Sequence, residues 1–473
     1  MKLRRAHVAA CALLVFFSAA TLAATAAAAA TAADPRLTKA SRHEKAGWIY
    51  LHVEGAPRDR GFQYGSLLAS EIAEDMRVRR AVWEHETSME WSWLVSRVKA
   101  FMVPKVDAEN LAEIDGLVEG LKAAGVATSR EEMVAHNAIL ELSWYWWPIE
   151  KKKLTGETVS PKKQSCSSFI ATGKMTKDGG VVLGHNTMFG YAAARANVIL
   201  DVLPAKGHRI LMQTEPGWIH SGTDFFITDA GLVGSETTIG DFEGFDEKGL
   251  PEFARMRRAT QDASSIDDWV AVMKKGNNGG YANAWLLGDV NTGEIARLEL
   301  GLKYTGFERT KDGFFVSSNV AENLKILRLE TSRKETDIRM SSVARRVRWK
   351  QLMKENAGRI DADLAKVFEA DHWDAYLGKE NPSGRSLCGH FELDPQASGS
   401  DIPYEPSGTF DAKVVDRAMA KSLSFAARWG SACDIPFDAD KFLRDHPQFE
   451  HLRGLVKSRP TQPWTVFRAG ENE

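Results

Sequence analysis

Residues 166–189 read CSSFIATGKMTKDGGVVLGHNTMF and contain two strand-like runs. Residues 167–172 and 181–185 are rich in β-branched and apolar side chains, and a polar segment that ends in two glycines separates them. This pattern predicts two strands, the first of which begins directly after Cys166. Only Ser165 separates the cysteine from a polar, lysine-rich segment at residues 150–164, which predicts an exposed loop.

Outward from this stretch, strands and helices occur in separate groups, which favours an α+β fold with antiparallel sheets over alternating β-α-β units. Apolar residues at helical spacing distinguish the helices from the strands. Further strands are predicted at residues 47–53, 197–203, 209–214, 225–228, 232–237, 282–287, 295–300, 304–308 and 314–317. Helices are predicted at residues 67–102, 108–124, 130–147, 252–275, 338–355, 361–369 and 413–427.

The composition is that of a globular protein. Of its 473 residues, 44% are hydrophobic and 26% are charged, and 61 basic residues against 63 acidic ones give a net charge of -2. Disordered chains combine low hydrophobicity with high net charge, so most of this chain should fold. The charge balance also excludes a polybasic nucleic-acid binder, and no nucleic-acid partner is expected.

Residues 1–33 have the features of a signal peptide. Basic residues at Lys2, Arg4 and Arg5 precede an apolar run at residues 8–22, and residues 23–33 offer several A-x-A cleavage sites. We expect a secreted or periplasmic protein, with an uncleaved membrane anchor as the alternative. The chain has no N-x-[ST] acceptor site, so glycosylation-dependent sorting to a lysosome-like compartment is not supported.

The remaining cysteines would then lie in an oxidising compartment. Cys388 and Cys433 could form a disulfide there, which would leave Cys166 as the odd cysteine; the alternative is that all three are reduced and buried. No C-x2-C pair is present, so the cysteines imply no metal site, and no cofactor is expected.

The common catalytic motifs are absent, including G-x-S-x-G, H-E-x-x-H and the glycine-rich phosphate loops. A cysteine between a loop and a strand suggests a different chemistry, in which cleavage between Ser165 and Cys166 exposes a new N-terminal residue. The freed α-amine has an ordinary pKa of about 8, close to the thiol value of about 8.5. One residue can then act as both nucleophile and base.

Residues 166–189 resemble the nucleophile segment of the phospholipase B-like proteins, which are N-terminal-nucleophile (Ntn) hydrolases related to isopenicillin-N acyltransferase. Three more blocks follow in the family's order: DFFITDAGLVGSETTI at 224–239, YANAWLLGDVNTGEI at 281–295 and SGTFDAKVVDRAMAKSLSFAARWG at 407–430. The resemblance implies a four-layer αββα sandwich with an N-terminal helical segment at residues 34–165 and a catalytic fragment at 166–473. It also implies self-cleavage, two fragments that stay associated, and a thioester on Cys166.

The same resemblance implies the catalytic residues. His185 and Asn186 take the place of an Arg-Asn pair in the ceramidase and bile-salt relatives, and Met188 replaces an aspartate. This departure favours the phospholipase B-like branch. Four residues complete the predicted catalytic group, with an amide as oxyanion donor: Asn283, Glu236, Thr237 and Thr238. For these residues, roles in turns and strand pairing are the structural alternative.

The predicted substrate is a small acylated molecule, either a lipid or an N-acyl amide, with peripheral contact to membrane lipid. Trp144 and Trp147 are candidate walls of an acyl pocket, or else helix core, and Arg385 and His390 are candidate substrate contacts, as is Asn186. Hydrolysis and acyl transfer are both consistent with the sequence. Two rival functions are a papain-type hydrolase that pairs Cys166 with His372 or His390, and a non-catalytic exported binding protein.

Overall fold

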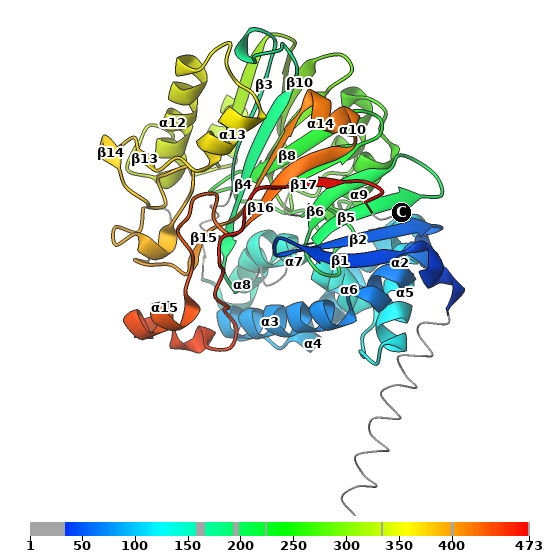
Figure 1. Cartoon of the computed structure of the whole chain (residues 1–473). Coiled ribbons are helices and arrows are strands. Elements are labelled where there is room, and N and C mark those ends of the chain that lie inside the picture. Colours follow the sequence, from blue (N-terminus) through cyan, green and yellow to red (C-terminus); the bar gives the residue numbers. More distant parts are fainter. Residues whose placement is uncertain are drawn as a thin grey trace, which may run out of the picture.

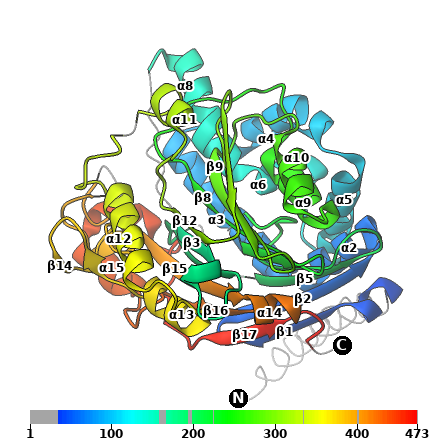
Figure 2. The same cartoon turned by 90° about the horizontal axis from the view of Figure 1, so that it is seen from above.

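Two β-sheets pack face to face, and helices cover both outer faces (Figures 1 and 2). The computed structural model describes residues 34–157, 166–192, 198–222, 225–332, 334–398 and 402–471. Alternating residues of both sheets form a shared core, for example Ile170 and Leu183 against Ile227 and Leu286. Both faces of each sheet are therefore buried, and the predicted αββα sandwich is confirmed.

The larger sheet has nine strands in the order β1-β2-β5-β6-β7-β8-β9-β10-β11. Neighbours are antiparallel except for β2 and β5, which run parallel. A parallel pair needs a long crossover, and here the chain makes it through the helices that follow β2. The strands are β1 Ser41–Lys45, β2 Trp48–Gly55, β5 Val198–Pro204, β6 Ile210–Thr214, β7 Phe225–Thr228, β8 Leu232–Thr238, β9 Asn283–Asp289, β10 Glu294–Leu300 and β11 Thr305–Thr310.

The smaller sheet has six antiparallel strands in the order β12-β3-β4-β15-β16-β17. Strand β3 lies inside this sheet, with Ser167 opposite Asn186 and Ser168 opposite His185 on β4. The strands are β12 Gly313–Ser317, β3 Ser167–Thr172, β4 Val182–Gly190, β15 Ser407–Asp416, β16 Ser424–Trp429 and β17 Thr465–Arg468, and a separate hairpin pairs β13 Trp373–Asp374 with β14 Lys379–Glu380.

Most helices cover the outer face of the nine-stranded sheet (Figure 2). They are α2 Pro57–Leu67, α3 Ala69–Thr87, α4 Trp91–Phe101, α5 Ala108–Ala123, α6 Arg130–Asn137, α7 Ile139–Glu141, the π-turn η3 Leu142–Trp146, α8 Trp147–Thr155, α9 Glu252–Asp262 and α10 Ile266–Lys274. On the outer face of the other sheet, Phe169 and Val182 pack against Trp349 and Phe368 of α12 Ser341–Glu355 and α13 Ala362–Glu369. The shorter helices are α11 Leu324–Leu329, α14 Arg417–Lys421 and α15 Ala439–Asp445.

The helix predicted at residues 413–427 is wrong, because this segment forms the end of β15, the short helix α14 and most of β16. Lys413 is fully buried and pairs with Asp411, and its ammonium group also bonds the Thr187 hydroxyl. A lysine at a buried position interrupts the alternation of apolar and polar residues by which a strand is predicted. The neighbouring alanines have a high helix propensity, so the sequence favours a helix.

Other boundaries also differ from the predictions. Helix α8 continues through Thr155, so the first part of the predicted loop at 150–164 is helical. Residues 67–102 form separate helices, and the predicted helix at 252–275 is broken before Ser265, which caps α10. The predicted N-terminal helical segment also supplies β1 and β2.

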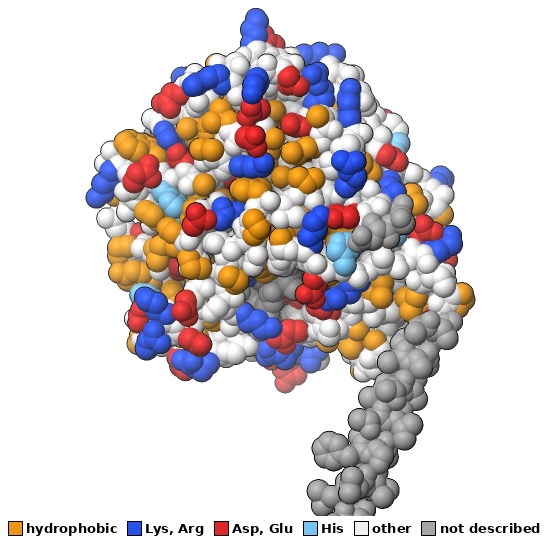
Figure 3. Space-filling view, viewed as in Figure 1, with side chains coloured by type: hydrophobic (Ala, Val, Ile, Leu, Met, Phe, Trp, Pro, Cys, Tyr) orange, Lys and Arg blue, Asp and Glu red, His pale blue; other side chains and the backbone are white. Residues whose placement is uncertain are grey.

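The surface mixes charges of both signs. On the face shown in Figure 3, basic and acidic side chains are intermixed, with hydrophobic side chains between them, in agreement with the small net charge of -2. Among the described helices, none has both the length and the apolar character needed to cross a bilayer. The predicted signal peptide lies outside the described residues, so export stays a prediction.

Candidate active site at Cys166

Cys166 lies immediately before β3 and is only 2% exposed. Its backbone has a φ of 63°, which places a residue with a side chain in the left-handed region. This conformation is uncommon outside glycine and concentrates at functional sites. Ser165 lies outside the described residues.

The Cys166 carbonyl group is held from helix α12. Arg345 Nη1 donates to the Cys166 carbonyl oxygen over 2.6 Å, and Arg345 Nη2 donates to Asn319 Oδ1 over 2.8 Å. Asn319 Nδ2 donates in turn to the carbonyl oxygen of Thr238 on β8 over 2.8 Å. This chain of bonds connects the start of β3 to the facing sheet.

A small cavity of about 20 Å³ adjoins Cys166. It is large enough for about one water molecule. Besides Cys166, its lining includes two charged residues, four aromatic ones and three others: Arg79, Glu215, Phe189, Trp218, Tyr281, Phe410, Leu140, Thr187 and Gly222. Among these described residues there is no histidine.

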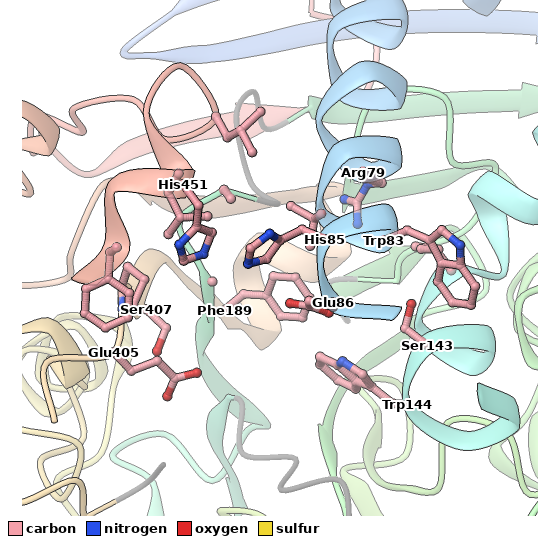
Figure 4. Close-up of a pocket in the computed structure, with 18 of the residues that line it drawn as sticks. Arg79, Trp83, His85, Glu86, Ser143, Trp144, Phe189, Glu405, Ser407 and His451 are labelled. Atoms are coloured by element: carbon pink, nitrogen blue, oxygen red, sulfur yellow. The ribbon is translucent and has the colours of Figure 1, made fainter. Parts of the chain in front are cut away.

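A second cavity, of about 590 Å³, adjoins the small one (Figure 4). Arg79, Leu140 and Phe189 line both cavities, so these three residues lie at their junction. The large cavity has aromatic walls that include Trp83 and Trp144, and Figure 4 shows polar groups such as Glu86, Glu405 and His451 around the same space. Its volume is within the range of small-molecule binding sites.

Glu215 and Arg79 form the charged side of the small cavity. Burial raises the pKa of Glu215 well above its ordinary value, and the positive charge of Arg79 offsets this only in part. Arg79 itself forms an ion pair with Asp75 one helical turn away. A raised pKa favours the protonated form of the carboxyl group, which can donate a hydrogen bond or a proton to a substrate beside the thiol.

Two of the predicted residues of β8, Glu236 and Thr238, contact Tyr281, another residue of the small cavity. Tyr281 donates its hydroxyl hydrogen to Glu236 Oε1 over 2.6 Å, and the Thr238 hydroxyl donates to the Tyr281 oxygen over 3.2 Å. Thr237 bonds the Ser317 hydroxyl of β12. Glu236 and Thr238 are thus connected to the cavity through Tyr281.

Asn283 begins β9 opposite Thr238 and is fully buried. Neither Nδ2 nor Oδ1 of its amide has a hydrogen-bond partner among the described residues. A buried amide without partners costs free energy, and such groups are often reserved for a ligand or a reaction.

His185 and Asn186 point to opposite faces of β4. His185 Nε2 lies 3.0 Å from the carbonyl oxygen of Glu236, to which it can donate a hydrogen bond. Burial is the main cause that lowers the pKa of His185 well below its ordinary value, and the positive charge of Lys413 lowers it further. Asn186 Nδ2 donates to the carbonyl oxygens of Glu369 and Leu387, toward the helical layer. Neither residue lines the two cavities.

The predicted substrate contacts separate into two groups. Trp144 lines the large cavity and lies against Phe189, with ring centroids 5.2 Å apart, whereas Trp147 packs on Trp83 behind the wall. Arg385 is buried in an ion pair with Asp374, away from both cavities.

His390 lies with Cys388 and Cys433 instead of Cys166. The predicted disulfide is not formed in the structure, where both cysteines are free. Both sulfur atoms contact the His390 ring, and the two thiol groups also interact with each other.

Four charged residues near Cys166 were missed from the sequence: Arg79, Glu215, Arg345 and Lys413. They come from α3, the segment after β6, α12 and β15, and no motif connects them. The sequence does not distinguish a buried charged residue from an exposed one, so only the fold shows that these four residues are buried near Cys166.

Comparisons with known proteins agree with the sequence blocks. The Phospholipase B family model matches residues 108–302. The chain resembles the phospholipase B-like proteins. Phospholipase B of Crotalus adamanteus is 24% identical over 52% of this chain and 48% of its own length. Putative phospholipase B-like 2 of Bos taurus is 29% identical over 26% of this chain and 24% of its own length.

An uncharacterized protein of Archaeoglobus fulgidus is 22% identical over 55% of this chain and 45% of its own length. The matches thus span less than half the length of these relatives. Among solved structures, a mutant conjugated bile acid hydrolase of Clostridium perfringens aligns with a TM-score of 0.31 and 10% identity over 55% of this chain and 88% of that chain. A second variant of that hydrolase gives a TM-score of 0.34 and 9% identity over 55% and 89%.

Proposed function

We propose that this protein is an exported cysteine hydrolase or acyltransferase that cleaves acyl ester or amide bonds through a thioester on Cys166, with lipid acyl groups as favoured substrates. The observation that carries the proposal is the position of Cys166 at a small cavity that shares three lining residues with one of about 590 Å³. The resemblance to phospholipase B-like proteins supports the same class of reaction.

The first step is self-cleavage between Ser165 and Cys166. The Cys166 sulfur attacks the Ser165 carbonyl carbon, the C–N bond breaks, and the α-nitrogen of Cys166 takes the thiol proton. Water then hydrolyses the resulting thioester, which releases a carboxyl group on Ser165 and returns the thiol. The left-handed backbone of Cys166 and the Arg345 bond to its carbonyl group support a strained, fixed geometry at this position.

The second step uses the new N-terminus as the base. The α-amine accepts the thiol proton, the thiolate attacks the substrate acyl carbon, and the leaving alcohol or amine receives the proton. Water or an acceptor amine then attacks the thioester. Asn283 is the proposed oxyanion donor, because its amide is buried and has no partner among the described residues.

The walls of the large cavity support an acyl substrate. Trp83, Trp144 and Phe189 present broad apolar surfaces, and polar groups such as Glu405 and Ser407 lie across the same space (Figure 4). This distribution suits a molecule with an apolar chain and a polar head.

Intact mass and N-terminal sequencing of the purified protein test the proposal. Wild type should give a fragment that begins at Cys166, whereas Cys166→Ala should remain one chain and lose at least about 10³-fold in acyl-ester hydrolysis. Cys166→Ser is the matched control, because it retains a hydroxyl nucleophile of similar size. Cleavage of the alanine variant at this position, or a fully active uncleaved wild type, would contradict self-processing.

The papain-type alternative requires a histidine beside Cys166. None of the described residues that line the small cavity is histidine, and His390 contacts other cysteines. The alternative of a binding protein without catalysis predicts an intact chain that releases no product from acyl esters or amides.

A further inference from the structure

Two cysteines and two histidines from three separate segments converge on the outer side of the six-stranded sheet. We call His372, Cys388, His390 and Cys433 the Cys2His2 cluster. Their ligand atoms all lie within 4.8 Å of one another. His372 follows α13, Cys388 and His390 follow β14, and Cys433 follows β16.

The distances match a tetrahedral metal site. Zinc bonds of about 2.3 Å to sulfur and about 2.0 Å to nitrogen place neighbouring ligand atoms about 3.3–3.8 Å apart. In the structure, His390 Nε2 lies 3.5 Å from Cys388 Sγ and 3.3 Å from Cys433 Sγ. The rings of His372 and His390 have centroids 5.2 Å apart. A metal ion at the centre needs only small side-chain movements.

The surroundings orient the cluster for ligation. Glu392 Oε1 accepts a hydrogen bond from His390 Nδ1 over 2.8 Å, which leaves Nε2 directed at the two sulfur atoms. Histidines that bind metals usually donate their other nitrogen to a carboxylate in this way. The Ile435 amide donates to Cys433 Sγ over 3.4 Å and supports a thiolate there. His372 Nε2 is buried and has no hydrogen-bond partner among the described residues.

We propose that the Cys2His2 cluster binds one zinc ion as a closed structural site. Four protein ligands leave no open position for a substrate, which distinguishes such a site from a catalytic one. Two thiolates and two imidazoles also select zinc over hard cations such as magnesium and calcium. The ligand spacing, with fifteen, one and forty-two residues between successive ligands, resembles no short motif, so the sequence predicts no metal here.

The site would brace one wall of the large cavity. Gly389, between two ligands, exchanges hydrogen bonds of 2.8 Å with Thr409 on β15. Phe391, two residues after Gly389, and Ser407, two residues before Thr409, line the cavity. A zinc ion would therefore connect the loop after β14 and the end of β16 to the strand that carries this wall.

Metal analysis of the full-length protein, purified without added metal, tests the site. Wild type should contain about one zinc ion per chain, and Cys388→Ser and Cys433→Ser should each lose most of it. Cys166→Ser is the matched control and should keep its zinc, because Cys166 is not in the cluster. Removal of zinc by a chelator should lower the melting temperature by about 5 °C or more.

A second measurement does not depend on the variants. Cobalt(II) added to metal-stripped wild type should give the visible absorption of tetrahedral cobalt and a thiolate charge-transfer band, and zinc should bleach both. Absence of bound zinc together with a Cys388–Cys433 disulfide in peptide mapping would overturn the proposal. Both readouts are independent of hydrolysis, so failure here leaves the proposed function of Cys166 unaffected.

Discussion

At the scale of residues, Asn283 is the proposed oxyanion donor, and it is not among the lining residues of either cavity. Its amide is fully buried, and neither polar atom has a partner among the described residues. We expect Asn283→Ala to lower kcat by about 10²- to 10³-fold with little change in KM, because the amide would act only on the transition state. Steady-state kinetics on an acyl ester would measure this.

The stability of the same variant supplies the control. Because the amide of Asn283 has no hydrogen-bond partner among the described residues, its removal leaves no other group unpaired. The free energy of unfolding should therefore fall only through the loss of side-chain volume. Thr237→Val, which breaks a side-chain bond to Ser317, is a useful comparison within the adjacent strand. An unchanged kcat in Asn283→Ala would exclude the amide from catalysis.

Leu140 lies at the junction of the two cavities. A tryptophan there would reduce the space that a long acyl chain needs to extend from Cys166 into the large cavity, so Leu140→Trp should lower kcat/KM for long-chain esters by about tenfold or more and affect acetyl esters much less. Leu140→Met, which conserves volume, should behave like wild type for both substrates. Equal losses on short and long chains would indicate that the acyl chain does not enter the large cavity.

The sequence identified some of these residues and not others, for a physical reason. Cys166 stood out because it follows a polar loop and precedes a strand, which is a local pattern. Arg79 and Glu215 reach the same cavity from elements far apart in the chain. Their charges are buried only because the layers close over them, and no local pattern reports that.

At the scale of elements, helix α12 fixes the start of β3. Trp349 Nε1 donates to Ser167 Oγ over 2.6 Å, one residue after the carbonyl group that Arg345 holds. Trp349→Phe keeps an aromatic ring but removes the donor, and we expect a loss of about 1–3 kcal/mol in the free energy of unfolding. Urea denaturation would measure the change.

A double-mutant cycle with Ser167→Ala isolates the bond. The combined variant should lose less stability than the sum of the single variants, since each single change already breaks the same contact. Additive losses would show that the tryptophan acts through packing alone.

The accuracy of the sequence-based prediction differs from strand to strand. The bounds of β3 were predicted to the residue, because SSFIAT is β-branched and aromatic and ends at a glycine. Strand β15 was taken for a helix in part, because Lys413 is neutralised by Asp411 inside the core. Layer order was predicted through the family resemblance, whereas the parallel pairing of β2 with β5 had no signal in the sequence.

At the scale of the whole molecule, Asp201 joins the beginning and the end of the chain. Its carboxylate accepts hydrogen bonds from Tyr50, His52 and Arg209, and from the Gly470 amide. Burial raises the pKa of Asp201, but the hydrogen bonds from Arg209, His52 and Gly470 more than offset it and lower the pKa to about 2.

This carboxylate should make stability depend on pH in acid. An unfolded aspartate has a pKa of about 3.9, so the contribution is complete above that value and is lost as the pH falls toward about 2. We expect a loss of about 2 kcal/mol from this group, measured by denaturation at several pH values. Asp201→Asn should be less stable than wild type at neutral pH, and its free energy of unfolding should fall less steeply as the pH is lowered. If the free energy of unfolding had the same pH dependence in both proteins, the assignment to Asp201 would be contradicted.

The parallel pairing of β2 with β5 also has a consequence for assembly. Seven backbone positions of β2 are in register with β5, and the two strands lie on opposite sides of residue 165 in the chain. If the backbone is cut there, the edge hairpin of the large sheet belongs to a different polypeptide from the strand that it pairs with. Refolding of the cut protein would then be a second-order process, and its rate would increase with protein concentration. The uncut precursor would refold at a rate that does not depend on concentration.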